Sequence, residues 1–173
     1  MTAPDLNQSV FVDNDGVRIH ALDNGRVDAP LPPVLVVPGM GEYADEYTWL
    51  LDALGERRVV IVDVRGRGRS DVPDAGYRWE DHIGDLHAVV GATGLDRPVV
   101  VAFSRGSSYA LGYALEHPTG LRGLVVGDEL AAQWQAALPS VELVMLADAG
   151  HDLWSRDVDA YLAVLLPFVA RCV

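Results

Sequence analysis

The sequence contains no lysine: all 13 of its basic residues are arginine, against 25 aspartate and glutamate residues. Chemistry that needs a primary amine on a side chain is therefore excluded, including Schiff-base formation, a phosphate-loop lysine and a lysine general base. The net charge of −12 argues against nucleic acid and anionic membrane surfaces as partners, because both would repel the chain. We expect neither as a partner.

Cysteine is almost absent as well, since Cys172 is the only one. One thiol can form neither an internal disulfide nor a cysteine zinc site, and this scarcity is typical of intracellular proteins. The first ten residues lack the charged-then-apolar pattern of a signal peptide, and no apolar run approaches the roughly 20 residues of a membrane helix. We expect a cytoplasmic protein.

Apolar residues, in contrast, make up half of the 173 positions, which is enough for a sizeable core. We find no low-complexity segment and no internal repeat with a period of roughly 20 to 50 residues. The sequence therefore predicts a single domain over residues 1–173.

Short apolar runs alternate with segments of helical spacing. Ser9–Asp15 and Val17–Leu22, joined at Asn14-Asp15-Gly16, predict an antiparallel hairpin. Further strands are predicted at 34–37, 59–64, 99–103, 121–126 and 141–147, and helices at 47–54, 79–90, 107–116, 129–138 and 158–168. Because these strands are apolar without interruption, we predict an α/β fold: a three-layer, doubly wound, mostly parallel sheet with the hairpin at its amino-terminal edge.

Ligands of such sheets bind at the carboxyl ends of the strands, and one of these ends carries Ala102-Phe103-Ser104-Arg105-Gly106. This small-x-Ser-x-Gly pattern is typical of a sharp strand-to-helix turn, which holds the serine in a strained conformation above the sheet. Ser104 is therefore a candidate nucleophile. The alternative is that it caps the following helix, as serine often does.

A serine hydroxyl needs a base, and imidazole has a suitable pKa near neutrality. His151, in LADAGHDLW, is in the loop after a predicted strand and follows Ser104 in the chain. The remaining histidines fall within the hairpin or in helices: His20, His82, His87 and His117. We predict that His151 is the base.

Four ordered motifs make the chain similar to the α/β-hydrolase superfamily over nearly its whole length: VLVVPGMGEY, VVIVDVRGRGRSD, AFSRGSS and DAGHDL. The resemblance implies a serine hydrolase that cleaves a carboxylic ester, thioester or lactone of a small molecule and needs no cofactor and no metal. It also implies that the backbone N–H groups of Met40 and Arg105 form the oxyanion hole. Asp63 would brace loops near the site.

The sequence departs from the family pattern in two ways. Pro38 replaces the histidine that often precedes the oxyanion-loop glycine, and a single helix connects Val126 to the last strand. The cap domain and one core strand are therefore absent, so we expect a minimal, capless form of the fold. This shortening removes the loop that most often supplies the acid of the triad.

Asp128 is our candidate for the triad acid, because it directly follows the strand that would lie beside the one preceding His151. An acid after the sixth strand is also a known variant in this superfamily. The competing interpretation is that Asp128 caps the next helix, and Glu129 is the second candidate.

A non-catalytic or weakly active protein that binds a small ligand or a partner is the alternative to an enzyme, because the cap is missing and the oxyanion loop is altered. Loss of a cap would also uncover apolar surface, which favours self-association.

Overall fold

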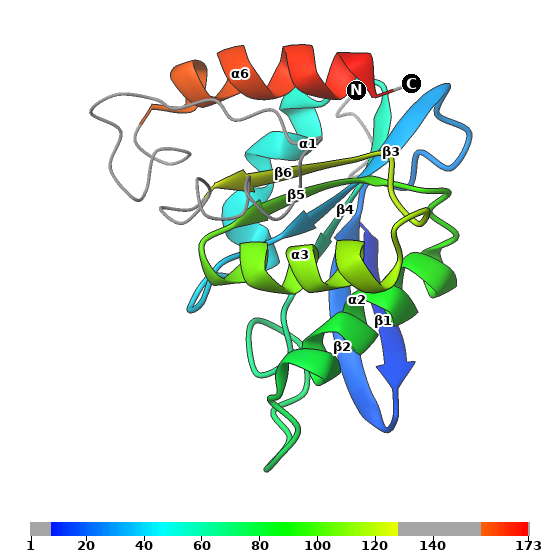
Figure 1. Cartoon of the computed structure of the whole chain (residues 1–173), viewed down its shortest axis with the longest axis vertical. Helices are drawn as coiled ribbons and strands as arrows, with labels where there is room; N and C mark the ends of the chain where they lie inside the picture. The colour runs from blue at the N-terminus through cyan, green and yellow to red at the C-terminus, as the bar shows by residue number, and fades with distance from the viewer. Residues whose placement is uncertain (1–7, 128–156, 173) are drawn as a thin grey trace, which may run out of the picture.

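The computed structural model describes residues 8–127 and 157–172 (Figure 1). Its strands are β1 (Gln8–Asn14), β2 (Val17–Asp23), β3 (Leu31–Val37), β4 (Arg57–Val62), β5 (Val99–Phe103) and β6 (Gly123–Gly127). Its helical segments are η1 (Ala44–Tyr47), α1 (Trp49–Ala53), α2 (Trp79–Thr93), α3 (Arg105–Glu116) and α6 (Val158–Arg171).

The six strands form one sheet in the order β1-β2-β4-β3-β5-β6. The β1–β2 and β2–β4 pairs are antiparallel, and the remaining pairs are parallel. In the hairpin turn, Asp15 has φ 51° and Gly16 has φ 81°, as a two-residue turn with positive φ at both positions requires. The predicted hairpin and the mostly parallel α/β sheet are both confirmed.

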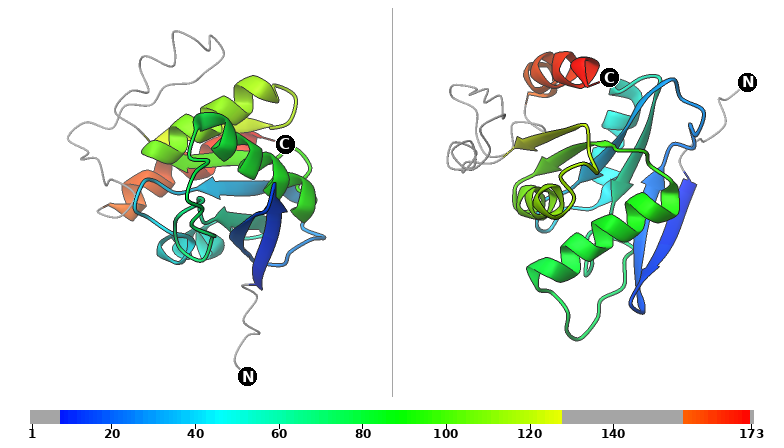
Figure 2. Two further views of the ribbon diagram at one scale, coloured as in Figure 1. Left: turned by 90° about the horizontal axis from the view of Figure 1, so that it is seen from below. Right: turned by 45° about the vertical axis from the view of Figure 1, so that its right-hand side comes forward.

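Successive residues of the central strands point to opposite faces of the sheet, and both faces are buried. Val34 and Val36 pack in the cluster that contains side chains of α1 and α6, whereas Leu35 and Val37 pack in the cluster of α2 and α3. Figures 1 and 2 show these two helix pairs on the two sides of the sheet. This double burial explains the unbroken apolar runs and confirms the three layers.

Some predicted boundaries are wrong. The helix predicted over 47–54 is present as the shorter α1, and a separate 3-10 turn, η1, precedes it. β3 begins at Leu31, before two prolines, and its register with β4 shifts between Leu31 and Val34 because proline has no N–H to donate to the ladder. The helix predicted at 129–138 and the strand at 141–147 lie outside the described residues.

The adjacent strands β3 and β5 are the point where the sheet changes winding direction. The chain leaves β3 toward η1 and α1, on one face, and leaves β5 toward α3, on the other face. Between two such connections a crevice forms outside the carboxyl ends of the strands, where doubly wound proteins bind their ligands. Pro38-Gly39 and Ser104 occupy these two ends.

No helix in residues 8–127 and 157–172 combines the length and the apolar character needed to cross a bilayer.

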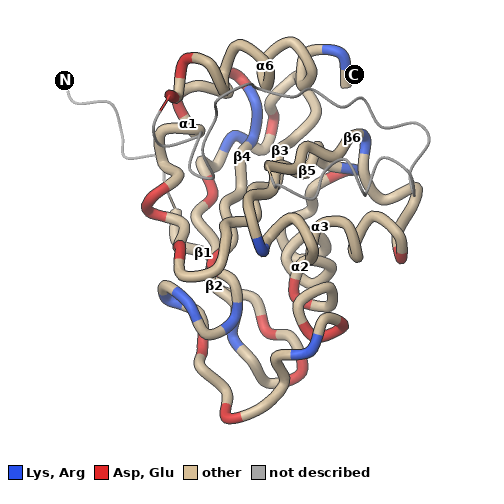
Figure 3. The backbone as a smooth tube through the Cα atoms, turned by 60° about the vertical axis from the view of Figure 1, so that its left-hand side comes forward, with Lys and Arg blue, Asp and Glu red and all other residues tan. Residues whose placement is uncertain are grey.

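Acidic residues and arginines are interspersed along the chain in Figure 3.

Candidate active site

Ser104 stands at the corner between β5 and α3 with φ 44° and ψ −124°. Few non-glycine residues adopt a positive φ, because the side chain then crowds its own backbone, at a cost of about 1–3 kcal/mol. The side chain of Ser104 makes no capping hydrogen bond to α3, which contradicts the helix-cap interpretation. The strained corner that the small-x-Ser-x-Gly pattern predicts is present.

Gly106 allows the end of β3 to pass directly over the start of α3. A Cβ atom at this position would lie 2.3 Å from the carbonyl oxygen of Pro38 and 2.5 Å from that of Val37. Real Cβ atoms do not come this close to backbone oxygens, so the position requires glycine. The second small residue of the motif therefore brings the loop after β3 next to Ser104.

The side chain of Glu42 holds the loop after β3 in place through two hydrogen bonds. Its Oε2 accepts a hydrogen bond from the backbone N–H of Gly39 at 2.6 Å and another from the Tyr47 hydroxyl at 2.5 Å. Burial, together with the neighbouring Glu42 carboxylate, raises the pKa of Tyr47, so that its hydroxyl stays protonated and donates. Sequence reasoning missed both residues, although an acidic side chain within a glycine-rich loop after a strand is a usable signal.

The predicted oxyanion donors flank the same corner. The Gly39 N–H is engaged by Glu42, and the next N–H along the loop belongs to Met40. Arg105 is the first residue of α3, where no carbonyl of the helix can accept its N–H. A carbon built on Gly39 would be 3.1 Å from Cβ of Ser104, so the loop and the serine are in contact. The role of Met40 and Arg105 as donors stays a prediction.

Asp63 braces three segments around the site, as expected. It accepts hydrogen bonds from the backbone N–H groups of Ala44 and Arg69, at 2.6 and 2.8 Å, and lies 2.7 Å from Nδ1 of His20. Burial by itself would raise the pKa of Asp63, but the hydrogen bonds from His20, Ala44 and Arg69 outweigh it and hold the pKa below its ordinary value. This carboxylate therefore ties β2, η1 and the arginine-rich turn after β4 together.

Asp128 and His151, the other members of the predicted triad, lie outside the described residues, and so does Glu129. Residue 127, the last described before this gap, lies next to the candidate nucleophile, because the backbone N–H of Ser104 donates to the carbonyl oxygen of Gly127 at 2.8 Å.

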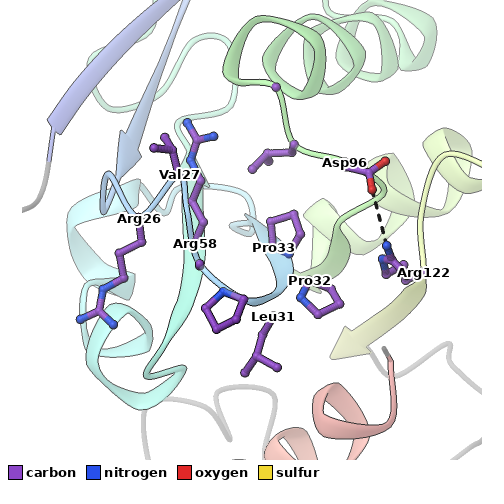
Figure 4. Close-up of a pocket in the computed structure, with 12 residues that line it drawn as sticks. Arg26, Val27, Leu31, Pro32, Pro33, Arg58, Asp96 and Arg122 are labelled. Atoms are coloured by element: carbon purple, nitrogen blue, oxygen red, sulfur yellow. Dashed lines mark hydrogen bonds and ion pairs between the residues drawn. The ribbon is translucent and has the colours of Figure 1, made fainter.

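A cleft of about 400 Å³ lies at the other end of the sheet (Figure 4). Its lining includes Pro32 at the start of β3, Arg58 at the start of β4 and Arg122, which precedes β6. The Arg122 guanidinium there lies 3.5 Å from the Asp96 carboxylate. Ser104 is not among the residues that line this cleft.

Residues 32–128, more than half of the chain, match a protein family described as having the alpha/beta hydrolase fold. The chain belongs to this alpha/beta hydrolase family. The resemblance predicted from the four motifs is confirmed.

Two curated relatives are similar to the chain over part of their length. Lipase 1 of Psychrobacter immobilis is 31% identical over 126 residues, which are 72% of this chain and 39% of the lipase. Epoxide hydrolase B of Mycobacterium tuberculosis is 32% identical over 114 residues, which are 64% of this chain and 32% of that enzyme. The chain thus spans less than half of either protein, in keeping with the shortened form that the sequence predicts.

One solved structure matches at nearly full length on both sides. The crystal structure of a predicted CIB-like hydrolase from Thermoplasma acidophilum has a TM-score of 0.84, with 95% of this chain and 98% of that chain covered. Its sequence identity is only 13%, so this likeness shows the fold alone.

Proposed function

We propose that the chain is a serine hydrolase that cleaves a carboxylic ester, thioester or lactone, with Ser104 as nucleophile, His151 as base and Asp128 as the acid that orients the imidazole. The main support is the strained corner at Ser104, where φ is 44° at the switch point of the sheet. Strain of this kind in a hydroxyl-bearing residue is typical of catalytic positions. The relatives are hydrolases, and their names, lipase and epoxide hydrolase, indicate different bonds.

In the proposed reaction, Oγ of Ser104 attacks the carbonyl carbon while His151 takes the hydroxyl proton and then gives it to the leaving group. The backbone N–H groups of Met40 and Arg105 hold the oxygen as it gains charge, and each such donor is typically worth about 3 kcal/mol of barrier. The start of α3 adds a favourable helix dipole at the same place. Water then hydrolyses the acyl-enzyme by the same proton transfers in reverse order.

Asp128 is proposed as the acid on the basis of chain connectivity. Gly127, whose carbonyl oxygen accepts from the Ser104 N–H, is the residue to which Asp128 is attached. The carboxylate of Asp128 is therefore one residue beyond the Gly127 carbonyl that contacts Ser104. Glu129 is the second candidate for the acid.

The proposal is tested with Ser104→Ala and p-nitrophenyl acetate. We expect turnover by the purified protein to fall by at least about 10³-fold, because both the nucleophile and the covalent intermediate are lost. Ser108→Ala, one turn further along α3, is the matched control and should keep its activity. Unchanged turnover in the Ser104 variant would reject this mechanism.

A non-catalytic binding protein is the other hypothesis, and labelling with a fluorophosphonate distinguishes the two, since only an activated serine reacts. Covalent label on Ser104 supports the hydrolase. Its absence in the folded protein, together with no ester turnover, supports the binding protein.

A further inference from the structure

A serine, a histidine and an aspartate that are not members of the predicted triad are joined in one chain of hydrogen-bonding contacts. Oγ of Ser9 lies 3.1 Å from Nε2 of His20, and Nδ1 of His20 lies 2.7 Å from Oδ2 of Asp63. These atoms and this order match the arrangement that activates a serine nucleophile. The three residues, called here the Ser9 relay, come from β1, β2 and the residue after β4.

The hairpin register places Ser9 beside His20. Ser9 is opposite Leu22 and Phe11 is opposite His20, so Ser9 and His20 are diagonal neighbours on the same face of the hairpin. The backbone of His20 is also fixed on both sides: its N–H donates to the Ser70 hydroxyl at 2.8 Å, and its carbonyl accepts from the Asp63 N–H at 2.9 Å. The imidazole is therefore held in place before any reagent arrives.

Burial differs along the Ser9 relay in the way that catalysis requires. The side chains of His20 and Asp63 are only 1% and 3% exposed, whereas Ser9 is exposed to solvent. An ionised carboxylate can only accept hydrogen bonds, so Nδ1 of His20 carries the proton and Nε2 is free to accept the proton of Ser9. A base sheltered from water thus touches an accessible hydroxyl.

Arg69 adds a positive charge at the hydroxyl. Its Nη1 donates to Oγ of Ser9 at 2.8 Å, and its Nη2 pairs with the Asp45 carboxylate at 3.1 Å. The backbone N–H of Arg69 donates to Asp63, which fixes the arginine to the same relay. A guanidinium beside a hydroxyl stabilises the negative charge that develops on oxygen as the proton leaves.

We propose that Ser9 is a second reactive serine of this chain, which His20 and Asp63 activate toward small activated esters and organophosphorus reagents. Oγ of Ser9 attacks the carbonyl carbon, its proton passes to Nε2 of His20, and the bond to the leaving oxygen breaks. His20 then returns the proton to the leaving alcohol, and an acyl-Ser9 ester remains.

The experiment labels Ser104→Ala with a fluorophosphonate and maps the modified residue by mass spectrometry after trypsin digestion. Since the chain lacks lysine, trypsin cuts only after arginine, and residues 1–18 form a peptide in which Ser9 is the sole serine. The peptide of residues 106–122 carries Ser107 and Ser108 as internal controls. We expect label on the Ser9 peptide and none on the control peptide.

His20→Gln should slow labelling of Ser9 by about 10²-fold or more, the usual contribution of a general base. Circular dichroism checks its fold. Arg69→Gln, which leaves His20 and Asp63 in place, should slow the reaction by about tenfold and serves if the first variant does not fold. The inference is overturned if the Ser9 peptide stays unlabelled, or if folded His20→Gln and Arg69→Gln both react at the rate of the parent.

The outcome for Ser9 is independent of the outcome for Ser104. In the unmutated protein the two serines fall in different tryptic peptides, residues 1–18 and 79–105. Label on either peptide alone supports one proposal and rejects the other.

Discussion

Buried histidines of this chain behave differently because their neighbours differ. His20 has a partner on each ring nitrogen, whereas Nδ1 of His82 is buried and has no hydrogen-bond partner within residues 8–127 and 157–172. The ring of His82 stacks on Tyr109, with centroids 4.0 Å apart. Burial lowers the pKa of His82 to about 4, so the ring is neutral in the folded protein at neutral pH.

This pKa predicts a loss of stability in mild acid. Between about pH 6.5 and pH 4 the unfolded chain takes up a proton on His82 that the folded chain does not, so the free energy of unfolding should fall by roughly 1–3 kcal/mol. The acidic neighbours Asp85 and Asp81 oppose the shift, and Arg65 and Arg67 reinforce it. Urea denaturation at several pH values measures the effect.

His82→Gln is the control, because glutamine does not titrate in this range. The stability of this variant should depend less on pH between 6.5 and 4, and an unchanged pH dependence would contradict the role given to His82.

The lowered pKa of Asp63 affects stability in a separate pH range. Its contribution to stability is present above the ordinary aspartate pKa of about 3.9 and is lost as the pH falls through the lower pKa of the folded state.

Strands and helices were largely predictable, and the contacts between them were not. Unbroken β-branched runs define β5 at the predicted residues, because a strand buried on both faces has no polar positions. The elbow at Ser104 was also predictable, since its motif lies within five consecutive residues. The Ser9 relay was not, because His20 is 11 residues from Ser9 and 43 from Asp63, and only the strand register brings them together.

At the junction of β3 and α3, Gly106→Ala should destabilise the protein severely, by about 3 kcal/mol or more. The new methyl group would meet the backbone oxygens of Pro38 and Val37, which cannot move without shifting a central strand. Gly91→Ala is the matched change within α2, where a Cβ atom would meet nothing within 4 Å.

Alanine is the better helix former, so Gly91→Ala should stabilise the chain by about 0.5–1 kcal/mol. Thermal unfolding of the two variants beside the parent provides the measurement. Equal effects of the two substitutions would show that the close approach at Gly106 does not constrain the fold.

Over the whole molecule, Arg57 connects parts of the chain that are remote in sequence. Its guanidinium donates to the carbonyl oxygens of Pro32, at 2.8 Å, and of Val169 in α6, at 2.9 Å. Cys172 follows α6 and packs against Gly123 at the start of β6. One buried arginine therefore holds the carboxyl-terminal helix to the first parallel strands.

We predict that Arg57→Met loosens this helix and makes Cys172 at least about tenfold more reactive toward a disulfide reagent such as DTNB. In the parent, burial raises the pKa of the Cys172 thiol and outweighs the Arg57 and Arg171 charges, which lower it, so the expected gain in rate comes from loss of burial and not from loss of the Arg57 charge. Because Cys172 is the only thiol, the absorbance change of the DTNB reaction reports on the end of α6 alone. Arg26→Met, which removes an exposed arginine that donates to Gly55, is the control and should not alter the rate.

The backbone angles at Ser104 have a further consequence. Glycine would adopt φ 44° without a steric penalty, so a sequence optimised only for thermal stability would carry glycine at this corner. Ser104→Gly should therefore melt at a higher temperature than the parent while losing the proposed nucleophile. A variant that is more stable and also inactive would show that serine is kept at this position for its chemistry, at a cost in stability.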